Sequence, residues 1–392
     1  MERLKELFGE IIDVRDIQGK RHCLMHILVM SVCAILCGYR DFEDIHDYSK
    51  AKAGWFEKHL RLWNGIPCSR TFNNVFRLIP AQSFLEIFMK WIKEIVQDKT
   101  GKQIIIDGKA MRGASEKAQN RNIPYIVSAY LSEVGISIGQ VRCDEKSNEI
   151  TAIPELIELL DIEGCIITID AIGCQSKIVS QIVKQKGHYC LSVKENQGNL
   201  YRDIDEYFKY ALSDPIESKN ISYHVTREFS HGRIEKRKYY LSSDEELISH
   251  INDRNKWKNL KTVGMVENTR EVDGKTTVKQ KYYILDIDLT AERFAEITRN
   301  HWRIENNLHW ILDMYFGEDL SRTRKDNALD NLSLLTKMCY NIISLDNRYD
   351  TVNKNGNLKK LSVKRKINRY NLYPNEFHDL LFSVIPNLPN FA

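Results

Sequence analysis

Apolar residues recur at three- and four-residue spacing from about residue 20 to residue 98, a pattern typical of helices. The most apolar stretch, Leu24 to Cys37, is too short to cross a membrane and predicts a buried helix. Ser69 is a candidate N-cap, and another helix is predicted after Pro80. We therefore expect a helical N-terminal domain over residues 1–98. The helix after Ser69 also has a polar face with side chains able to contact DNA, namely Arg70, Asn73, Asn74 and Arg77.

A different pattern begins near residue 103, where short runs of β-branched residues replace the helical spacing. Two of these runs, 103–106 and 166–169, lead directly into Asp107 and Asp170. Continuous apolar runs predict buried strands. A charged carboxylate is costly inside a core unless it has a partner. We therefore expect each aspartate to lie where its strand meets solvent or a metal ion.

The order of elements between residues 103 and 195 predicts the topology of a sheet. Strands are expected at 103–107, 123–130 and 136–142, then a helix, a strand ending before Asp170, a second helix and a last strand near 189–194. A short turn joins the second and third strands, as in an antiparallel meander. Three antiparallel strands followed by right-handed crossovers to parallel strands describe a mixed, ribonuclease H-like α/β sheet. Its first and fourth strands are neighbours, which would place Asp107 beside Asp170.

Strand-like runs continue from about residue 198 to 287 and predict a β-rich insertion within a catalytic domain of residues 99–345. Within it, the segment from Ser230 to Arg233 fits a turn. DNA contact by His231 and Arg233 is the second interpretation, because further cations follow. A helix is expected after the insertion, from Thr290 to about Phe316.

Glu305 lies on this last helix, on a stripe beside the apolar one. Three carboxylates from separate elements, Asp107, Asp170 and Glu305, are what a pair of divalent cations needs for phosphoryl transfer. His309 on the same stripe is expected to be a hydrogen-bonding neighbour, because hard Mg²⁺ prefers oxygen ligands.

Composition changes this picture little. Apolar content of 43% and charged content of 28% fit a soluble globular protein, and a net charge of +4 is too small to demonstrate a polyanionic partner. Basic residues cluster in the C-terminal segment 346–392, which indicates either a solvated surface or a phosphate-contacting tail. The nine single cysteines indicate buried free thiols in a reducing cytoplasm.

Six ordered blocks of the sequence resemble the DDE transposases of bacterial insertion sequences, most closely the H-repeat-associated branch. The likeness extends from about residue 20 to 385, and its blocks are Ile106-Asp107-Gly108-Lys109-Ala110-Met111-Arg112-Gly113, Asp144 to Ile150, Thr168 to Gln175, Val193 to Gly198, Ser230 to Arg233 and Arg299 to Asn306.

The resemblance implies a ribonuclease H-like catalytic domain that cleaves and transfers DNA strands at the ends of an insertion sequence. It implies that Asp107, Asp170 and Glu305 bind two Mg²⁺ ions, for which Mn²⁺ can substitute. The expected partners are terminal inverted repeats and target DNA, held by a dimer. Candidate DNA-contacting residues beside the motifs are Lys109, Arg112, Lys194, His231, Arg233, Arg299, His301 and Trp302.

The match departs from the wider family around Glu305. Many relatives place Tyr, Arg and Lys near the catalytic Glu, where this chain has Thr298, His301 and Leu312, so the roles of those three do not carry over. His301 stands where the Arg usually meets phosphate, and Trp302 is suited to stack on an unpaired base.

Three alternative functions compete with this interpretation. The first is a decayed or domesticated copy that only binds DNA, although all three carboxylates are present. The second is a haloacid dehalogenase-type phosphatase, which requires Asp-x-Asp, whereas Asp107 is followed by Gly108-Lys109. The third is a dinucleotide-binding Rossmann domain, for which no GxGxxG follows a strand.

Overall fold

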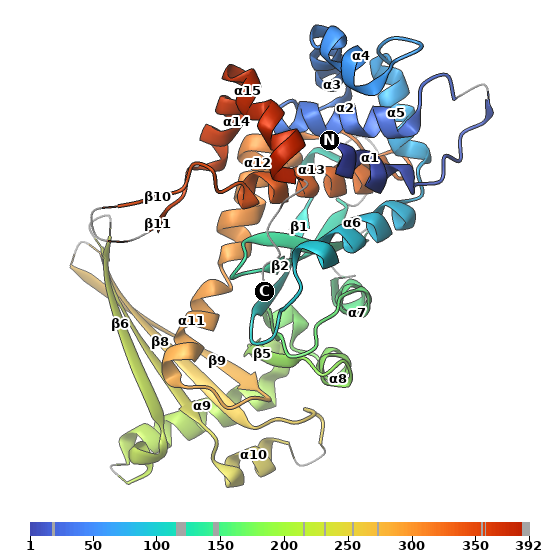
Figure 1. Ribbon diagram of the computed structural model, residues 1–392. Coiled ribbons are helices and arrows are strands. Elements are labelled where there is room, and N and C mark those ends of the chain that lie inside the picture. The colour runs from blue at the N-terminus through green and yellow to red at the C-terminus, as the bar shows by residue number, and fades with distance from the viewer. Residues whose placement is uncertain are drawn as a thin grey trace.

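The computed structural model describes residues 1–17, 20–114, 123–143, 149–214, 216–230, 233–252, 255–272, 274–353, 356 and 358–385. The predicted N-terminal helices are present and lie together at one end of the molecule (Figure 1). Cys68, not Ser69, is the N-cap of α5, because the helix already includes Ser69. The six helices are α1 (Glu2–Gly9), α2 (Leu24–Leu36), α3 (Phe42–Ala51), α4 (Ala53–Leu60), α5 (Ser69–Leu78) and α6 (Ala81–Ile95).

The central strands follow the predicted order and pairing. β1 (Gln103–Ala110) pairs antiparallel with β2 (Tyr125–Leu131), which pairs antiparallel with β3 (Ile136–Cys143). On its other side β1 pairs parallel with β4 (Ile166–Ile169), and β4 pairs parallel with β5 (His188–Val193). The prediction that the first and fourth strands are neighbours is confirmed. The crossover helices α7 (Glu149–Leu159) and α8 (Ser176–Lys184) lie together on one side of these strands (Figure 1).

The predicted β-rich insertion begins with a helix, α9 (Gly198–Ser213), and continues as a long antiparallel meander. Its strands do not form a separate sheet. Cys190 to Val193 of β5 pair with Leu285 to Tyr282 of β9, so nine strands form one sheet in the order β3-β2-β1-β4-β5-β9-β8-β7-β6. The remaining elements are β6 (Ser222–Ser230), β7 (Arg233–Ser242), α10 (Glu245–Ile251), β8 (Thr262–Val272) and β9 (Lys275–Leu285).

The helix predicted from Thr290 begins where expected but is not uniform. Thr290 caps α11 (Ala291–Asn300) by accepting a hydrogen bond from the Arg293 N–H at 3.1 Å. A π-helical segment, Ile304–His309, follows and leads into α12 (Trp310–Phe316). On β1, Gln103 and Asp107 share one face because side chains alternate along a strand. Gln103 Nε2 donates to the Ile297 carbonyl at 3.0 Å, so α11 covers the face of β1 that carries Asp107.

The C-terminal part returns to the N-terminal helices. α13 (Ala328–Leu345) is buried along nearly its whole length and contacts α2, α5, α6 and β3. The last elements are β10 (Thr351–Val352), β11 (Leu358–Lys359), α14 (Val363–Leu372), α15 (Pro374–Asp379) and a π-helical segment, Leu380–Val384. Lys366 of the basic C-terminal segment fits neither the solvated surface nor the phosphate-contacting tail that the sequence indicated. That side chain is buried, and its ammonium donates to the carbonyls of Ile343, at 2.9 Å, and Asp346, at 2.5 Å.

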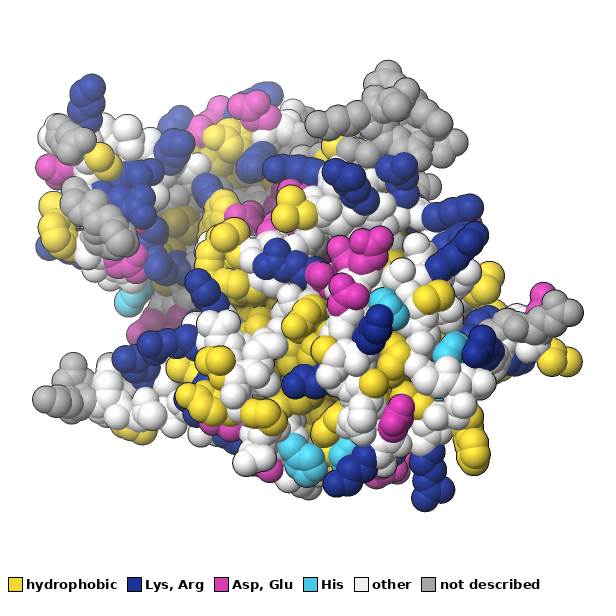
Figure 2. All heavy atoms as spheres, turned by 90° about the horizontal axis from the view of Figure 1, so that it is seen from above, with side chains coloured by type: hydrophobic (Ala, Val, Ile, Leu, Met, Phe, Trp, Pro, Cys, Tyr) yellow, Lys and Arg dark blue, Asp and Glu magenta, His cyan; other side chains and the backbone are white. Residues whose placement is uncertain are grey.

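Surface charge is dispersed on the face seen from above. Lys and Arg side chains form several separate groups there, with acidic and apolar side chains between them (Figure 2). All nine cysteines are free thiols, and only Cys23 and Cys68 are exposed. Across the described ranges, every helix is too short or too polar to cross a membrane.

Candidate active site

Asp107 and Asp170 lie side by side because of the register of the two parallel strands that carry them. Ile106 of β1 is the partner of Ile169 in β4, so the next residue on each strand is an aspartate. β4 ends before Asp170, as predicted, and the carboxylate caps the following turn by accepting from the Ile172 N–H at 3.0 Å. β1 continues through Ala110, so the expectation that it ends at Asp107 is wrong. The reason is that β2 still pairs with residues 108–110.

A cleft of about 800 Å³ opens over these two aspartates. Glu305 also lines it, so one cleft contains all three carboxylates named from the sequence. Its rim includes side chains from the insertion as well as from the central sheet. Other lining residues include Tyr125, Glu149, Thr168, Lys194, Lys279, Lys281, His301 and Trp302.

Glu305 lies in the π-helical segment, and its position follows from that local geometry. The Trp310 N–H bonds to the Glu305 carbonyl, five residues back, in place of the four-residue step of an α-helix. Ile304 and Leu308 are buried, which leaves Glu305 on the exposed side of the segment. Short π-helical turns occur frequently at functional sites because they shift side chains around the helix.

The three carboxylates repel one another. Burial, followed by the charges of Glu305 and Asp170, raises the pKa of Asp107 to about 7. Burial and then Asp170 also raise the pKa of Glu305, while Lys281 acts in the opposite direction. A hard divalent cation prefers oxygen ligands and would relieve this repulsion, so the donor set fits such an ion. Among the described residues, no group of three or more His, Cys, Asp or Glu side chains has the arrangement that could hold a metal ion.

Two histidines flank the carboxylates and are held neutral. His301 lines the cleft, with Nδ1 3.2 Å from Thr168 Oγ1, and burial lowers its pKa to about 4. His309 is buried, with Nδ1 3.5 Å from Asp107 Oδ2, and burial lowers its pKa to about 3. His309 is therefore a neighbour of Asp107, as the sequence suggested.

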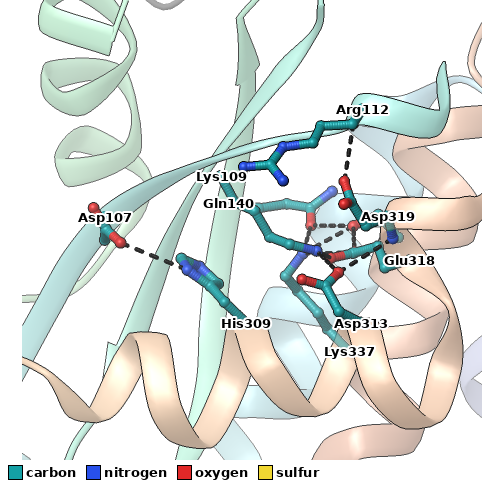
Figure 3. A network of polar contacts seen from close by, with 10 residues as sticks. Asp107, Lys109, Arg112, Gln140, His309, Asp313, Glu318, Asp319 and Lys337 are labelled. Atoms are coloured by element: carbon teal, nitrogen blue, oxygen red, sulfur yellow. Dashed lines mark hydrogen bonds and ion pairs between the residues drawn. The ribbon is translucent and has the colours of Figure 1, made fainter. Parts of the chain in front are cut away.

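Lys109 is not in the cleft, although it is two residues from Asp107. Its ammonium forms ion pairs with Asp313 and with Glu318, the latter at 2.7 Å (Figure 3). Glu318 in turn accepts from Ser333 at 2.8 Å and lies 3.5 Å from the buried Lys337 ammonium. We call Lys109, Asp313, Glu318, Ser333 and Lys337 the buried ion network. Through its ion pair with Asp313, Lys109 connects β1 to α12.

The other DNA-contact candidates are dispersed. Lys194 is exposed and lines the cleft with Trp302, whose side chain is half-exposed. The Arg299 guanidinium pairs with Glu228 at 2.7 Å. Arg112 lies outside the cleft, where its backbone N–H donates to Asp319 at 3.1 Å. Arg233 begins β7, and His231 is outside the described residues.

Lys281 and Glu149 are charged cleft residues that the sequence alone does not single out. Lys281 of β9 lies with its ammonium 4.8 Å from the centre of the Trp302 ring. It resembles any other lysine of a polar strand, so only the pairing of β9 with β5 reveals it. Glu149 belongs to a block quoted for the family resemblance, but no role was assigned to it. Its carboxyl group lies 2.6 Å from the point where a Cβ on Gly108 would stand, so a larger residue at position 108 would require the Glu149 side chain to move.

Comparison with known proteins defines the class. The transposase DDE domain family matches residues 98–342, and the domain associated with it matches residues 5–92. The chain therefore belongs to the transposase DDE domain family and has a transposase function in insertion sequences. Proteins of this family generally use divalent metal ions.

Individual relatives place the chain within the family. It is 37% identical over 347 residues to the transposase-named protein YncI of Escherichia coli O157:H7, covering 88% of this chain and 87% of that protein. It is 36% identical over 353 residues to the H repeat-associated protein YhhI of E. coli K12, covering 88% of this chain and 91% of that protein. The resemblance to the H-repeat-associated branch is confirmed. A cryo-EM structure of a piggyBac transposase synaptic complex with hairpin DNA aligns at a TM-score of 0.42 and 12% identity, covering 99% of this chain and 81% of that one.

Proposed function

We propose that this transposase cleaves DNA strands and joins them to a target at the cleft, using two divalent cations held by Asp107, Asp170 and Glu305. The observation that carries the proposal is that these carboxylates, from β1, the end of β4 and the π-helical segment, line one cleft, where burial and the neighbouring acidic charges raise the pKa of Asp107 and of Glu305. Mg²⁺, or Mn²⁺ in its place, supplies a Lewis acid that activates the attacking hydroxyl and stabilises the leaving oxygen. The strand order supports a ribonuclease H-like catalytic domain over residues 99–345.

The chain's own residues have separate tasks in this proposal. Asp107, Asp170 and Glu305 would supply the anionic oxygen ligands of the cations, and the bound cations would orient the reacting phosphate. Lys194 and Lys281 sit at the rim, where their charges can pair with backbone phosphates. Trp302, half-exposed beside Lys281, offers a ring on which an unpaired base can stack. DNA held in this way would be the terminal inverted repeats and then the target, bound by a dimer.

The test uses Asp107→Asn, Asp170→Asn and Glu305→Gln, which remove charge and keep shape. Each is expected to lose strand cleavage of an inverted-repeat duplex in Mg²⁺ while retaining binding measured by fluorescence anisotropy. Glu296→Gln is the matched control, because Glu296 is an exposed partner of Arg293 away from the cleft. Cleavage by any one of the three variants would remove that residue from the catalytic set. Binding without cleavage by the unmodified chain would favour the decayed DNA-binding alternative.

A further inference from the structure

Two side-chain contacts join β1 to the helical segment 304–316, which carries Glu305. Asp107 and Lys109 are two residues apart and project from the same face of β1. His309 and Asp313 are four residues apart and project from the same side of the helix. His309 faces Asp107, and Asp313 pairs with Lys109 (Figure 3). The contact between Lys109 and Asp313 belongs to the buried ion network. The contact of His309 is with Asp107, which lines the cleft.

The state of the His309 ring follows from its surroundings. The residue is only 9% exposed, and Nε2 has no hydrogen-bond partner among the described residues. A neutral imidazole carries one proton. A lone pair on Nδ1 would repel an ionised Asp107, so the proton belongs on Nδ1.

We propose that His309 is a positioning residue for Asp107, whose carboxylate it holds by an Nδ1–H donor so that it faces the cations of the cleft. The inference rests on the proposed function, since it presumes that Asp107 is a metal ligand. The present Nδ1 to Oδ2 distance of 3.5 Å is longer than a good hydrogen bond, and a shift of a few tenths of an ångström closes it. His309 follows Glu305 by one helical turn, so the same rigid segment sets the positions of two of the three carboxylates. Partners that orient metal ligands in this way commonly contribute 10–100-fold (an order-of-magnitude range) to metal affinity.

The experiment compares two substitutions that differ in where they place a donor. The amide nitrogen in His309→Asn stands close to the place of Nδ1, whereas the longer side chain in His309→Gln puts it near the place of Nε2. Mn²⁺ affinity is measured by calorimetry on the full chain without DNA. We expect His309→Gln to weaken Mn²⁺ binding about 10-fold or more and His309→Asn to stay within about 3-fold of the unmodified chain. Equal losses in both, or no loss in either, would overturn the inference.

An Asp107→Asn background separates this inference from the proposed function. If His309 acts through Asp107, adding His309→Gln there produces no further loss of Mn²⁺ affinity. If His309→Gln weakens Mn²⁺ binding in the Asp107→Asn background as much as it does in the unmodified chain, His309 does not act through Asp107. If Asp107→Asn alone binds Mn²⁺ like the unmodified chain, the proposed metal centre fails. If it binds weakly while His309→Gln binds normally, only the positioning role fails.

A spectroscopic measurement on the unmodified chain does not depend on whether the His309 variants fold. Nitrogen-15 spectra of histidine-labelled protein distinguish the two neutral tautomers, and the signal of His309 is assigned by its response to Asp107→Asn. We expect a proton on Nδ1 at a pH well above 7, where Asp107 is ionised. A proton on Nε2 would leave no donor facing Asp107 and would refute the inference.

Discussion

Replacing Asp107 by Asn should stabilise the metal-free protein while abolishing its chemistry. The pKa of Asp107 is raised from 3.8 to about 7 in the folded chain, so the folded state binds this proton more tightly than the unfolded state does. Stability is therefore lost as pH rises from about 4 to about 7, and the loss is complete above that. A shift of about three pKa units corresponds to at most about 4 kcal/mol at pH 8 and to about 1.5 kcal/mol at pH 5. Asparagine cannot ionise and avoids this cost.

Differential scanning calorimetry in a chelator measures the effect. Unfolding entropy of about 2.1 cal/mol/K per residue gives about 0.8 kcal/mol/K for 392 residues. We therefore expect the Tm of Asp107→Asn to exceed that of the unmodified chain by about 4–5 °C at pH 8 and by about 2 °C at pH 5. Saturating Mg²⁺ should narrow the difference at pH 8, because it stabilises the unmodified chain by binding its folded state. An equal Tm difference at both pH values, or a lower Tm for Asp107→Asn at pH 8, would refute the reasoning.

Three further predictions concern the buried ion network and the rim of the cleft. Glu318→Gln leaves the ammonium groups of Lys109 and Lys337 short of a counter-charge and should lower the free energy of unfolding, measured with denaturant, by about 3–5 kcal/mol. The exposed control Glu296→Gln should lower it by under about 1 kcal/mol, and similar losses in both would contradict the burial argument. Lys281→Ala should weaken DNA binding alike for all sequences and reduce the slope of log affinity against log salt by about 1, and an unchanged slope would exclude a phosphate contact. Trp302→Ala should weaken binding to an end with unpaired bases by about 1–3 kcal/mol but leave blunt duplex binding unchanged, and equal losses on both would exclude stacking.

The sequence predicts well those features that depend on local pattern. The β-branched runs before Asp107 and Asp170 identify two buried strands, and the order of elements makes them neighbours, as the register of Ile106 with Ile169 confirms. Glu305 came from a helical stripe and from the family resemblance. Its membership of a single catalytic set, like the division at residues 98 and 345, stays a prediction.

Features that depend on distant contacts were not predictable. Lys109 follows Asp107 by two residues and looks like a phosphate ligand, but Asp313 and Glu318, 204 and 209 residues away, bind its ammonium. The π-helical segment is also hidden, because Ile304 and Leu308 fit an α-helical stripe as well as they fit a π turn. The continuity of the sheet depends on β5 pairing with β9, which no local run of residues specifies.

The place of the insertion in the sheet also orders events during synthesis. Asp107 and Asp170 leave the ribosome first, and Glu305 follows 135 residues after Asp170 (305 − 170). β5 obtains its neighbour only when residues 282–285 of β9 have been made. Chains fold from the N-terminus as they are made, so a polypeptide that ends before residue 305 contains at most two of the three acidic ligands. Under the proposed function, the late position of Glu305 in the chain keeps polypeptides that lack it from cleaving the chromosome that encodes them.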